Sequence, residues 1–211
     1  MAIHKRTYGI LFAGAATAAV IGLSAAPAFA ATTWSVSPGG AITGKSGTTT
    51  LNDTSTGNSL TCTSSSTSAT LKKGSGLAGA GLGSITKVGF STCTGPLSLT
   101  FTVTTKDLPW KLNAVSYNAT TGVTTGTITG IDATLSGPSC SATVDGTGAG
   151  KHNGMVKATY TNSTGKLKVL TTGGNLHVYA VSGCAGLINT GDATTFSATY
   201  TVTPKQTIKG S

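Results

Sequence analysis

Four cysteines in two repeated settings constrain the fold of this chain more than any other feature. In each half a tryptophan is followed by two cysteines and then by a run in which threonine alternates with apolar residues. The order is kept while the gaps lengthen, which favours a duplicated unit with longer loops in its second copy. Chance recurrence in a repetitive composition is the alternative. The repeated residues are Trp34, Cys62 and Cys93, then Trp110, Cys140 and Cys184.

Residues 1–30 have the pattern of a secretory signal peptide. Lys5 and Arg6 precede an apolar run over residues 9–23, and Ala28-Phe29-Ala30 forms a cleavage site. A retained membrane anchor is the alternative, although small residues dilute the apolar run. We therefore expect residues 31–211 to be secreted, extracellular or loosely associated with the cell surface, with no transmembrane helix.

The cysteines are expected to form structural disulfides. An even number in an exported chain indicates bridges, and four cysteines allow three pairings. The repeat favours one bridge within each half, Cys62 with Cys93 and Cys140 with Cys184. The chain has no Cys-x-x-Cys pair, and two histidines after residue 30 cannot complete a spaced zinc cluster. No redox site, metal site or cofactor is expected.

The composition indicates an all-β protein. Thirty glycines, abundant threonine and 9% charged residues are typical of strands joined by many turns. We expect an antiparallel β-sandwich or a partly closed barrel built from two similar disulfide-stapled units. The units would span residues 31–107 and 108–211, and the two could form one continuous domain.

A meander is the clearest local prediction. Strand-like segments at 154–161, 167–171 and 175–181 are separated by Asn162-Ser163-Thr164-Gly165 and Thr172-Gly173-Gly174. Asn and Gly supply the positive φ that tight turns require. The three segments are therefore expected to pair in sequence order.

The charge balance is basic. After residue 30, twelve lysines and five aspartates give 12 − 5 = +7, without arginine or glutamate. Lysines without an adjacent arginine fork are a poor match to nucleic acid. The charge serves solubility first, with anionic cell-wall polymers or surface glycans as candidate partners.

Two catalytic patterns are weak. Gly39 to Ser46 matches the phosphate-binding loop G-x-x-x-x-G-K-[ST], but the residues that follow are poor helix formers, so the match is interpreted as coincidence. His177 with Asp192 or Asp145 could join a hydrolytic triad, although a surface or satisfied histidine is the simpler reading, and the same holds for His152 at a loop tip.

The aspartates and aromatic residues have ordinary structural explanations. Each aspartate lies near a turn signal, where it would cap backbone amides; a glycosidase pair or a calcium site are the alternatives. The tryptophans are expected in the core, and Tyr117 is the better exposed candidate for a binding platform. The aspartates are Asp53, Asp107, Asp132, Asp145 and Asp192, and the aromatic candidates are Trp34, Trp110, Tyr117, Tyr160, Tyr179 and Tyr200.

Two further segments add to the signal-like N-terminus and the Thr/Gly-rich composition. They are Gly183-Cys184-Ala185-Gly186-Leu187 and Thr199-Tyr200-Thr201-Val202-Thr203-Pro204. In these the chain resembles small secreted proteins of unknown function from actinobacteria, and no functional residue follows from the resemblance. The favoured function is a secreted or envelope-associated, non-enzymatic binding or structural role. An envelope β-barrel or pore-like protein and a secreted hydrolase are the alternatives.

Overall fold

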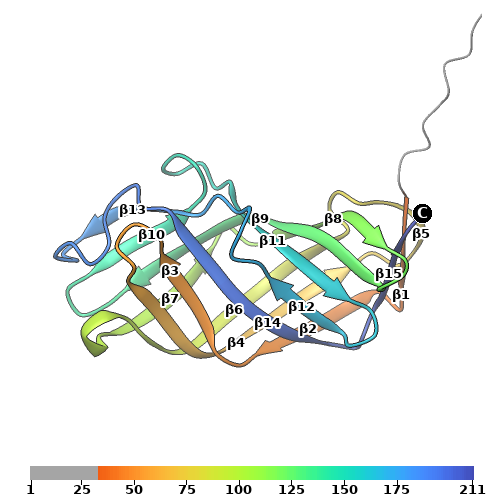
Figure 1. Ribbon diagram of the computed structural model, residues 1–211, viewed down its shortest axis with the longest axis horizontal. Helices are drawn as coiled ribbons and strands as arrows, with labels where there is room; N and C mark the ends of the chain where they lie inside the picture. The colour runs from red at the N-terminus through yellow and green to blue at the C-terminus, as the bar shows by residue number, and fades with distance from the viewer. Residues whose placement is uncertain (1–32) are drawn as a thin grey trace, which may run out of the picture. The chain divides into compact units, whose positions relative to one another are not determined.

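The computed structural model describes residues 33–211, and the predicted signal peptide at residues 1–30 lies outside them. These residues form β-strands and one short 3-10 turn, η1 (Pro96–Ser98) (Figure 1). The strands are β1 (Thr33–Ser37), β2 (Gly40–Ser46), β3 (Thr49–Asp53), β4 (Ser59–Leu71), β5 (Gly74–Ala78), β6 (Gly83–Thr94), β7 (Thr100–Lys106), β8 (Trp110–Asn118), β9 (Val123–Ser136), β10 (Ser141–Asp145), β11 (Gly154–Thr161), β12 (Lys166–Val169), β13 (His177–Ser182), β14 (Thr194–Thr203) and β15 (Thr207–Gly210).

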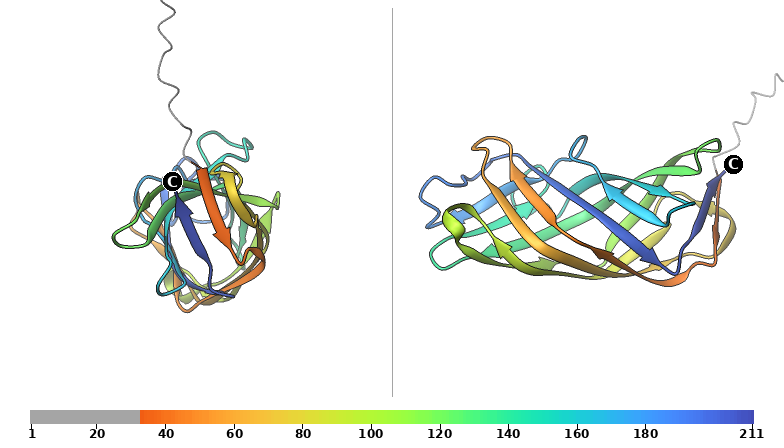
Figure 2. Two further views of the ribbon diagram at one scale, coloured as in Figure 1. Left: turned by 90° about the vertical axis from the view of Figure 1, so that its right-hand side faces the viewer. Right: turned by 60° about the horizontal axis from the view of Figure 1, so that its bottom comes forward.

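The large sheet curls into a partial ring (Figure 2). Its strands follow the order β11, β12, β14, β2, β4, β6, β8 and β9, and β9 pairs back to β11. Elsewhere β3 joins β14 to β4, β7 joins β6 to β9, and β10 and β13 extend from β9. Strand pairing closes the ring where β9 meets β11. Among the described residues, β13 pairs with β10 and is joined to the segment before β14 by one isolated bridge, His177 to Ala193, so the ring stays open at this end and is not a complete barrel.

A small second sheet of β15, β1 and β5 lies at one end of the described β structure, at the right in Figure 1. Every strand pair in both sheets is antiparallel, which confirms the predicted all-β, antiparallel fold. Strands from the two predicted units interleave, because β14 pairs with β2 and β3, β8 pairs with β6, and β15 pairs with β1. The described part of the first predicted unit, 33–107, and the second unit, 108–211, therefore contribute strands to both sheets.

Alternation of polar with apolar residues produces the two faces of strands such as β14. In β14, Ala198, Tyr200 and Val202 are buried while Thr199 and Thr201 are exposed, as the period of two in a strand requires. The buried set fills the interior of the ring, where a cavity of about 100 Å³ remains. Its apolar lining includes side chains from six strands of the ring: Leu60, Ile85, Ile128, Val156, Val169 and Tyr200.

The predicted meander is only partly correct. The first two strands pair as β11 with β12, but the third, β13, pairs with β10. The other neighbour of β12 is β14, from later in the chain. Turn residues specify where a chain reverses, whereas the choice of a strand's second neighbour depends on packing of distant segments.

Both predicted disulfides are present. Cys62 and Cys93 stand directly opposite each other on the paired strands β4 and β6. Cys140 precedes β10 and Cys184 follows β13, so their bridge ties the ends of a second strand pair. The two bridges confirm the pairing predicted within each half of the sequence, and all four cysteines are buried in the core.

Within residues 33–211 there is no helix of the length and apolar character needed to cross a membrane.

Candidate functional site

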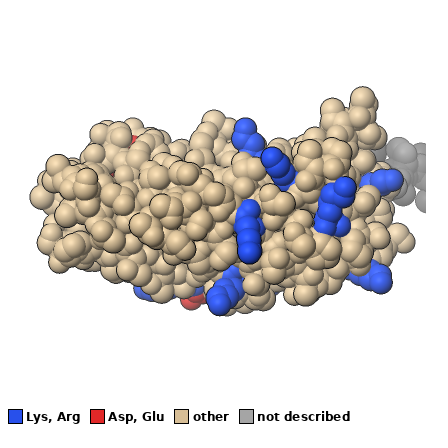
Figure 3. Space-filling model, turned by 90° about the horizontal axis from the view of Figure 1, so that it is seen from below, with Lys and Arg blue, Asp and Glu red and all other residues tan. Residues whose placement is uncertain are grey.

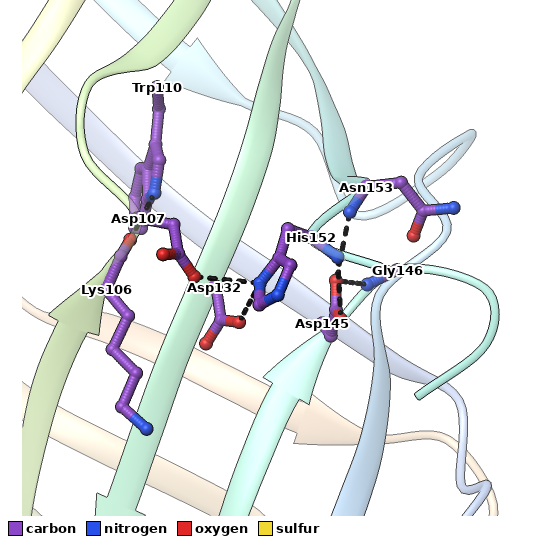
Figure 4. Close-up of polar contacts among 8 residues, drawn as sticks. All are labelled: Lys106, Asp107, Trp110, Asp132, Asp145, Gly146, His152 and Asn153. Carbon is purple, nitrogen blue, oxygen red and sulfur yellow. Dashed lines mark hydrogen bonds and ion pairs between the residues drawn. The ribbon is translucent and has the colours of Figure 1, made fainter. Parts of the chain in front are cut away.

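Three titratable side chains from different parts of the chain meet on one side of β9 (Figure 4). Asp107 directly follows β7, Asp132 lies within β9, and His152 belongs to the loop between β10 and β11. The imidazole Nδ1 is 2.7 Å from Oδ2 of Asp107 and 2.8 Å from Oδ2 of Asp132. We call these three residues the Asp–His cluster.

A β-bulge decides where Asp132 points. Gly130 has a φ of 83° and is skipped in the pairing of β9 with β11. Ile128 and Ile131 are therefore both buried in the ring, although strict alternation from Ile128 would have turned Asp132 into the core. The bulge instead places Asp132 on the outer face of β9, where Asp107 and His152 contact it.

Asp132 is nevertheless only 3% exposed. Its Oδ2 contacts His152, while its Oδ1 is buried without a hydrogen-bond partner. Burial raises the pKa of the Asp132 carboxyl, the hydrogen bond with His152 opposes that shift, and the nearby charges of Asp145 and Asp107 add to it. The cluster therefore holds a carboxylate that is costly to ionise without a neighbouring cation.

Asp145 closes the loop that carries His152. Its carboxylate is fully buried at the end of β10 and accepts backbone N–H groups from Gly146 at 2.6 Å, His152 at 3.0 Å and Asn153 at 3.1 Å. Burial acts to raise the pKa of Asp145, but these three donors outweigh it and the pKa is lowered. The two ends of the loop are thereby held together, and His152 is set with a φ of 51°.

Trp110 holds the turn that carries Asp107. The indole is buried, and its Nε1 donates to the carbonyl of Lys106 at 3.0 Å, across the turn. Asp107, like His152, has a φ of 51°, in the left-handed region that non-glycine residues seldom occupy. Such conformations persist where the surrounding contacts enforce them, and here they direct two side chains to one point.

The exposed members of the cluster face solvent. The side chains of His152 and Asp107 are 52% and 50% exposed. The pKa of His152 is raised, first by its hydrogen bond with Asp132 and then by the charge of Asp107. One nitrogen and two carboxylate oxygens, all within 4.8 Å of one another, could share a proton or hold a cation.

The triads considered from the sequence are not assembled in the described residues. The Nδ1 of His177 contacts the carbonyl oxygen of Asn175 at 2.8 Å, and no hydrogen bond joins this ring to Asp145 or Asp192. Asp145 is committed to its loop, and Asp192 accepts the N–H of Asn189 at 2.7 Å.

The turn interpretation holds for three aspartates and fails for Asp132. Asp107 lies in a turn, but among the described residues its carboxylate contacts His152 and caps no backbone amide. Asp53 accepts the N–H groups of Ser55 at 2.8 Å and Thr56 at 3.1 Å, as a turn cap does, and Asp145 and Asp192 act similarly. Asp132 lies inside β9 instead, so its assignment to a turn was wrong. The bulge at Gly130 explains why an aspartate is tolerated within this strand.

The sequence analysis interpreted His152 as an ordinary surface histidine and missed its place in the Asp–His cluster. Its segment, Asp145 followed by a glycine-rich loop, carries a turn signal that could have indicated a closed loop. Nothing local connects it with Asp107 or Asp132, because their approach depends on the pairing of β7 with β9 and of β9 with β11.

The remaining motifs are structural. The segment resembling a phosphate-binding loop forms β2 and leads into β3, without the helix that such a loop needs. Trp34 and Trp110 are buried, which confirms their core role, as are Tyr160 and Tyr200. Tyr117 is half-buried against the core, so it is better exposed than the two tryptophans, Tyr160 and Tyr200, as expected, although it does not stand free of the core.

A second surface feature is a basic face on five adjacent strands, β12, β14, β2, β4 and β6. These strands contain no aspartate or glutamate, and their four lysines are all exposed. Lysines are spread over the side of the molecule seen in Figure 3, where little acidic surface shows. Lys45 and Lys166 both stand opposite Thr201, from its two sides, so their backbones are about 10 Å apart. The lysines of this basic face are Lys45, Lys87, Lys166 and Lys168.

Comparisons with protein-family models, curated proteins and solved structures return no match to this chain.

Proposed function

We propose that this chain is an exported, non-enzymatic β protein that binds anionic polymers or glycans at the cell surface through its basic face. Two buried disulfides support an oxidising compartment, because such bridges persist in secreted and envelope proteins. The signal-like residues 1–30 support the same location.

The basic face is the observation that carries the proposal. Its lysines project from the outer side of strands that hold no acidic residue, so no carboxylate on the same strands neutralises them. Charges within about 10 Å of one another act together at about 0.1 M salt or below, since that is the screening length there. An extended polyanion lying across the strands would contact several lysines at once, whereas a compact anion would contact one.

Two observations favour this binding role over a pore-like protein and over a hydrolase: the apolar interior of the ring and the surroundings of His177. The ring is filled by apolar side chains, whereas a pore-like protein needs a polar, water-filled passage. A hydrolase built on His177 would need a carboxylate to orient the ring, but a backbone carbonyl occupies its Nδ1.

The proposal is tested by binding of the purified protein to soluble polyphosphate and to isolated cell-wall polymer, with dextran as the neutral control. The variant Lys45→Gln with Lys166→Gln and Lys168→Gln should bind the polyanions at least about tenfold more weakly at low salt, because each lysine near an anionic surface contributes about 1 kcal/mol. Raising the salt concentration should also weaken the binding of polyanions by the unmodified protein.

The matched control replaces three exposed lysines outside the basic face, Lys73, Lys111 and Lys209, by glutamine. It removes the same net charge and should retain most of the binding. Equal loss in both triple variants would show that net charge alone matters, and salt-independent binding would contradict an electrostatic face.

A further inference from the structure

We propose that the Asp–His cluster is a binding site for a divalent first-row transition-metal cation such as Zn²⁺. The ligand atoms are Nδ1 of His152 and Oδ2 of Asp107 and Asp132. This inference concerns a different surface from the basic face and does not depend on the proposed function.

The spacing of the donor atoms suits such an ion. Zinc lies about 2.0–2.2 Å from imidazole nitrogen and carboxylate oxygen, so its ligand atoms stand about 3.3–3.6 Å apart in tetrahedral geometry. The two nitrogen-to-oxygen distances are 2.7 Å and 2.8 Å, and all three atoms lie within 4.8 Å of one another. A small outward movement of the two exposed side chains would admit an ion.

The buried carboxylate of Asp132 is an independent indication of a ligand. Its side chain is 4% exposed, and Oδ1 is buried without a partner. A hydrogen-bond network alone leaves this oxygen unsatisfied, at the cost that any buried, unpaired polar atom carries. A cation held by Asp132 would neutralise the carboxylate and could engage both of its oxygens.

Neighbouring lysines do not supply that cation. Lys106 stands opposite Asp132 in the pairing of β7 with β9, yet within residues 33–211 the ion pairs of Asp132 and Asp107 are made with His152 alone. With a neutral imidazole the cluster carries two negative charges, which a divalent ion balances.

The scaffold holds the ligands in position before any ion arrives. Asp145 fixes the loop of His152 through three backbone hydrogen bonds, and Trp110 fixes the turn of Asp107. Outer residues that orient metal ligands in this way strengthen binding. The half-exposed His152 and Asp107 leave room for water to complete the coordination shell.

The donor set selects the class of ion. Calcium and magnesium prefer six or more oxygen ligands, whereas imidazole nitrogen favours zinc and its first-row neighbours. A single nitrogen with two carboxylates fits the second group.

The test uses purified, disulfide-bonded protein freed of metal by a chelator and then titrated with Zn²⁺ by calorimetry and with Co²⁺ by visible absorption. We expect one equivalent of each ion to bind and the melting temperature to rise with Zn²⁺. Asp132→Asn and His152→Gln should each weaken binding at least about tenfold, since changes to the residues that merely orient metal ligands already cost about 10–100-fold.

His177→Gln and Asp192→Asn are the matched controls, because they change the same residue types elsewhere and should bind as the unmodified protein does. Circular dichroism verifies that each variant is folded. If Asp132→Asn fails to fold, His152→Gln still tests the site, because it alters an exposed side chain. No binding at millimolar Zn²⁺ would overturn the proposal. Equal affinity in the unmodified protein and both cluster variants would overturn it as well.

Discussion

At the scale of single residues, buried polar side chains join distant parts of the chain. The hydroxyl of Tyr160 accepts the backbone N–H of Gln206 at 2.8 Å and donates to its carbonyl at 3.0 Å. The side chain of Gln206, 1% exposed, accepts the N–H of Gly39 at 2.8 Å. Tyr160 was one of the aromatic candidates for a binding platform, but it is buried and its hydroxyl bonds the backbone of Gln206.

These phenols lead to a pH prediction. Burial raises the pKa of Tyr160 and Tyr200 above the ordinary value of 10.0, although hydrogen bonds with Gln206 and Ser65 partly oppose it. Above pH 10 the unfolded chain therefore holds fewer protons than the folded one, and the free energy of unfolding falls as the pH rises through the folded pKa. Denaturant titrations from pH 8 upward, with tyrosinate absorbance at 295 nm, would measure this fall.

The variants Tyr160→Phe and Tyr200→Phe separate this effect from other titrations. Each removes one phenol and should make the alkaline fall shallower. Tyr160→Phe should also lower the free energy of unfolding at pH 7 by about 1–3 kcal/mol, because it leaves the backbone of Gln206 unpaired. An unchanged alkaline slope in both variants would contradict the prediction.

At the scale of elements, the two disulfides have different surroundings despite their similar sequence settings. Cys62 and Cys93 join strands that pair along most of their length, from Thr61 to Leu71 of β4. Cys140 and Cys184 instead hold β13, which among the described residues has β10 as its partner strand. The sequence indicated which cysteines pair, but not that one bridge secures the free edge of the sheet.

Removing either bridge should therefore lower the free energy of unfolding by a similar amount. The two removals should differ in how strongly they expose β13 to hydrogen exchange. The bridges span 31 and 44 residues, so the double alanine variants should each lower the free energy of unfolding by about 4 kcal/mol in the chain-entropy description. Hydrogen exchange should rise across β13 when Cys140 and Cys184 are replaced, and stay low there when Cys62 and Cys93 are replaced. Equal protection of β13 in both variants would show that the second bridge does not secure the edge.

At the scale of the whole described chain, β14 links the two predicted halves. It pairs with β12 from the second half and with β2 and β3 from the first. The small sheet does the same, since β1 lies between β15 and β5. Neither half can complete its backbone pairing alone, so the two should unfold together.

The two tryptophans test this cooperativity. Trp34 lies in the small sheet and Trp110 begins β8, and both are buried. In each single-tryptophan variant, Trp34→Phe or Trp110→Phe, the fluorescence midpoint in denaturant should coincide with the circular dichroism midpoint of that variant. Separate midpoints would support two independent units at residues 31–107 and 108–211.

The amino-acid sequence alone determined the β class, the hairpin of β11 and β12, the buried tryptophans and the disulfide partners. These follow from local alternation, turn residues and the repeated order of tryptophan and cysteine, all of which are visible within short segments. Only the tertiary structure decided that β13 pairs with β10 and that Asp107, Asp132 and His152 meet. The bulge at Gly130 reverses the face of Asp132, and the register of distant strands brings its partners to it. The local periodicity of the sequence reveals neither the bulge nor the strand register, because register depends on which distant segments pack together.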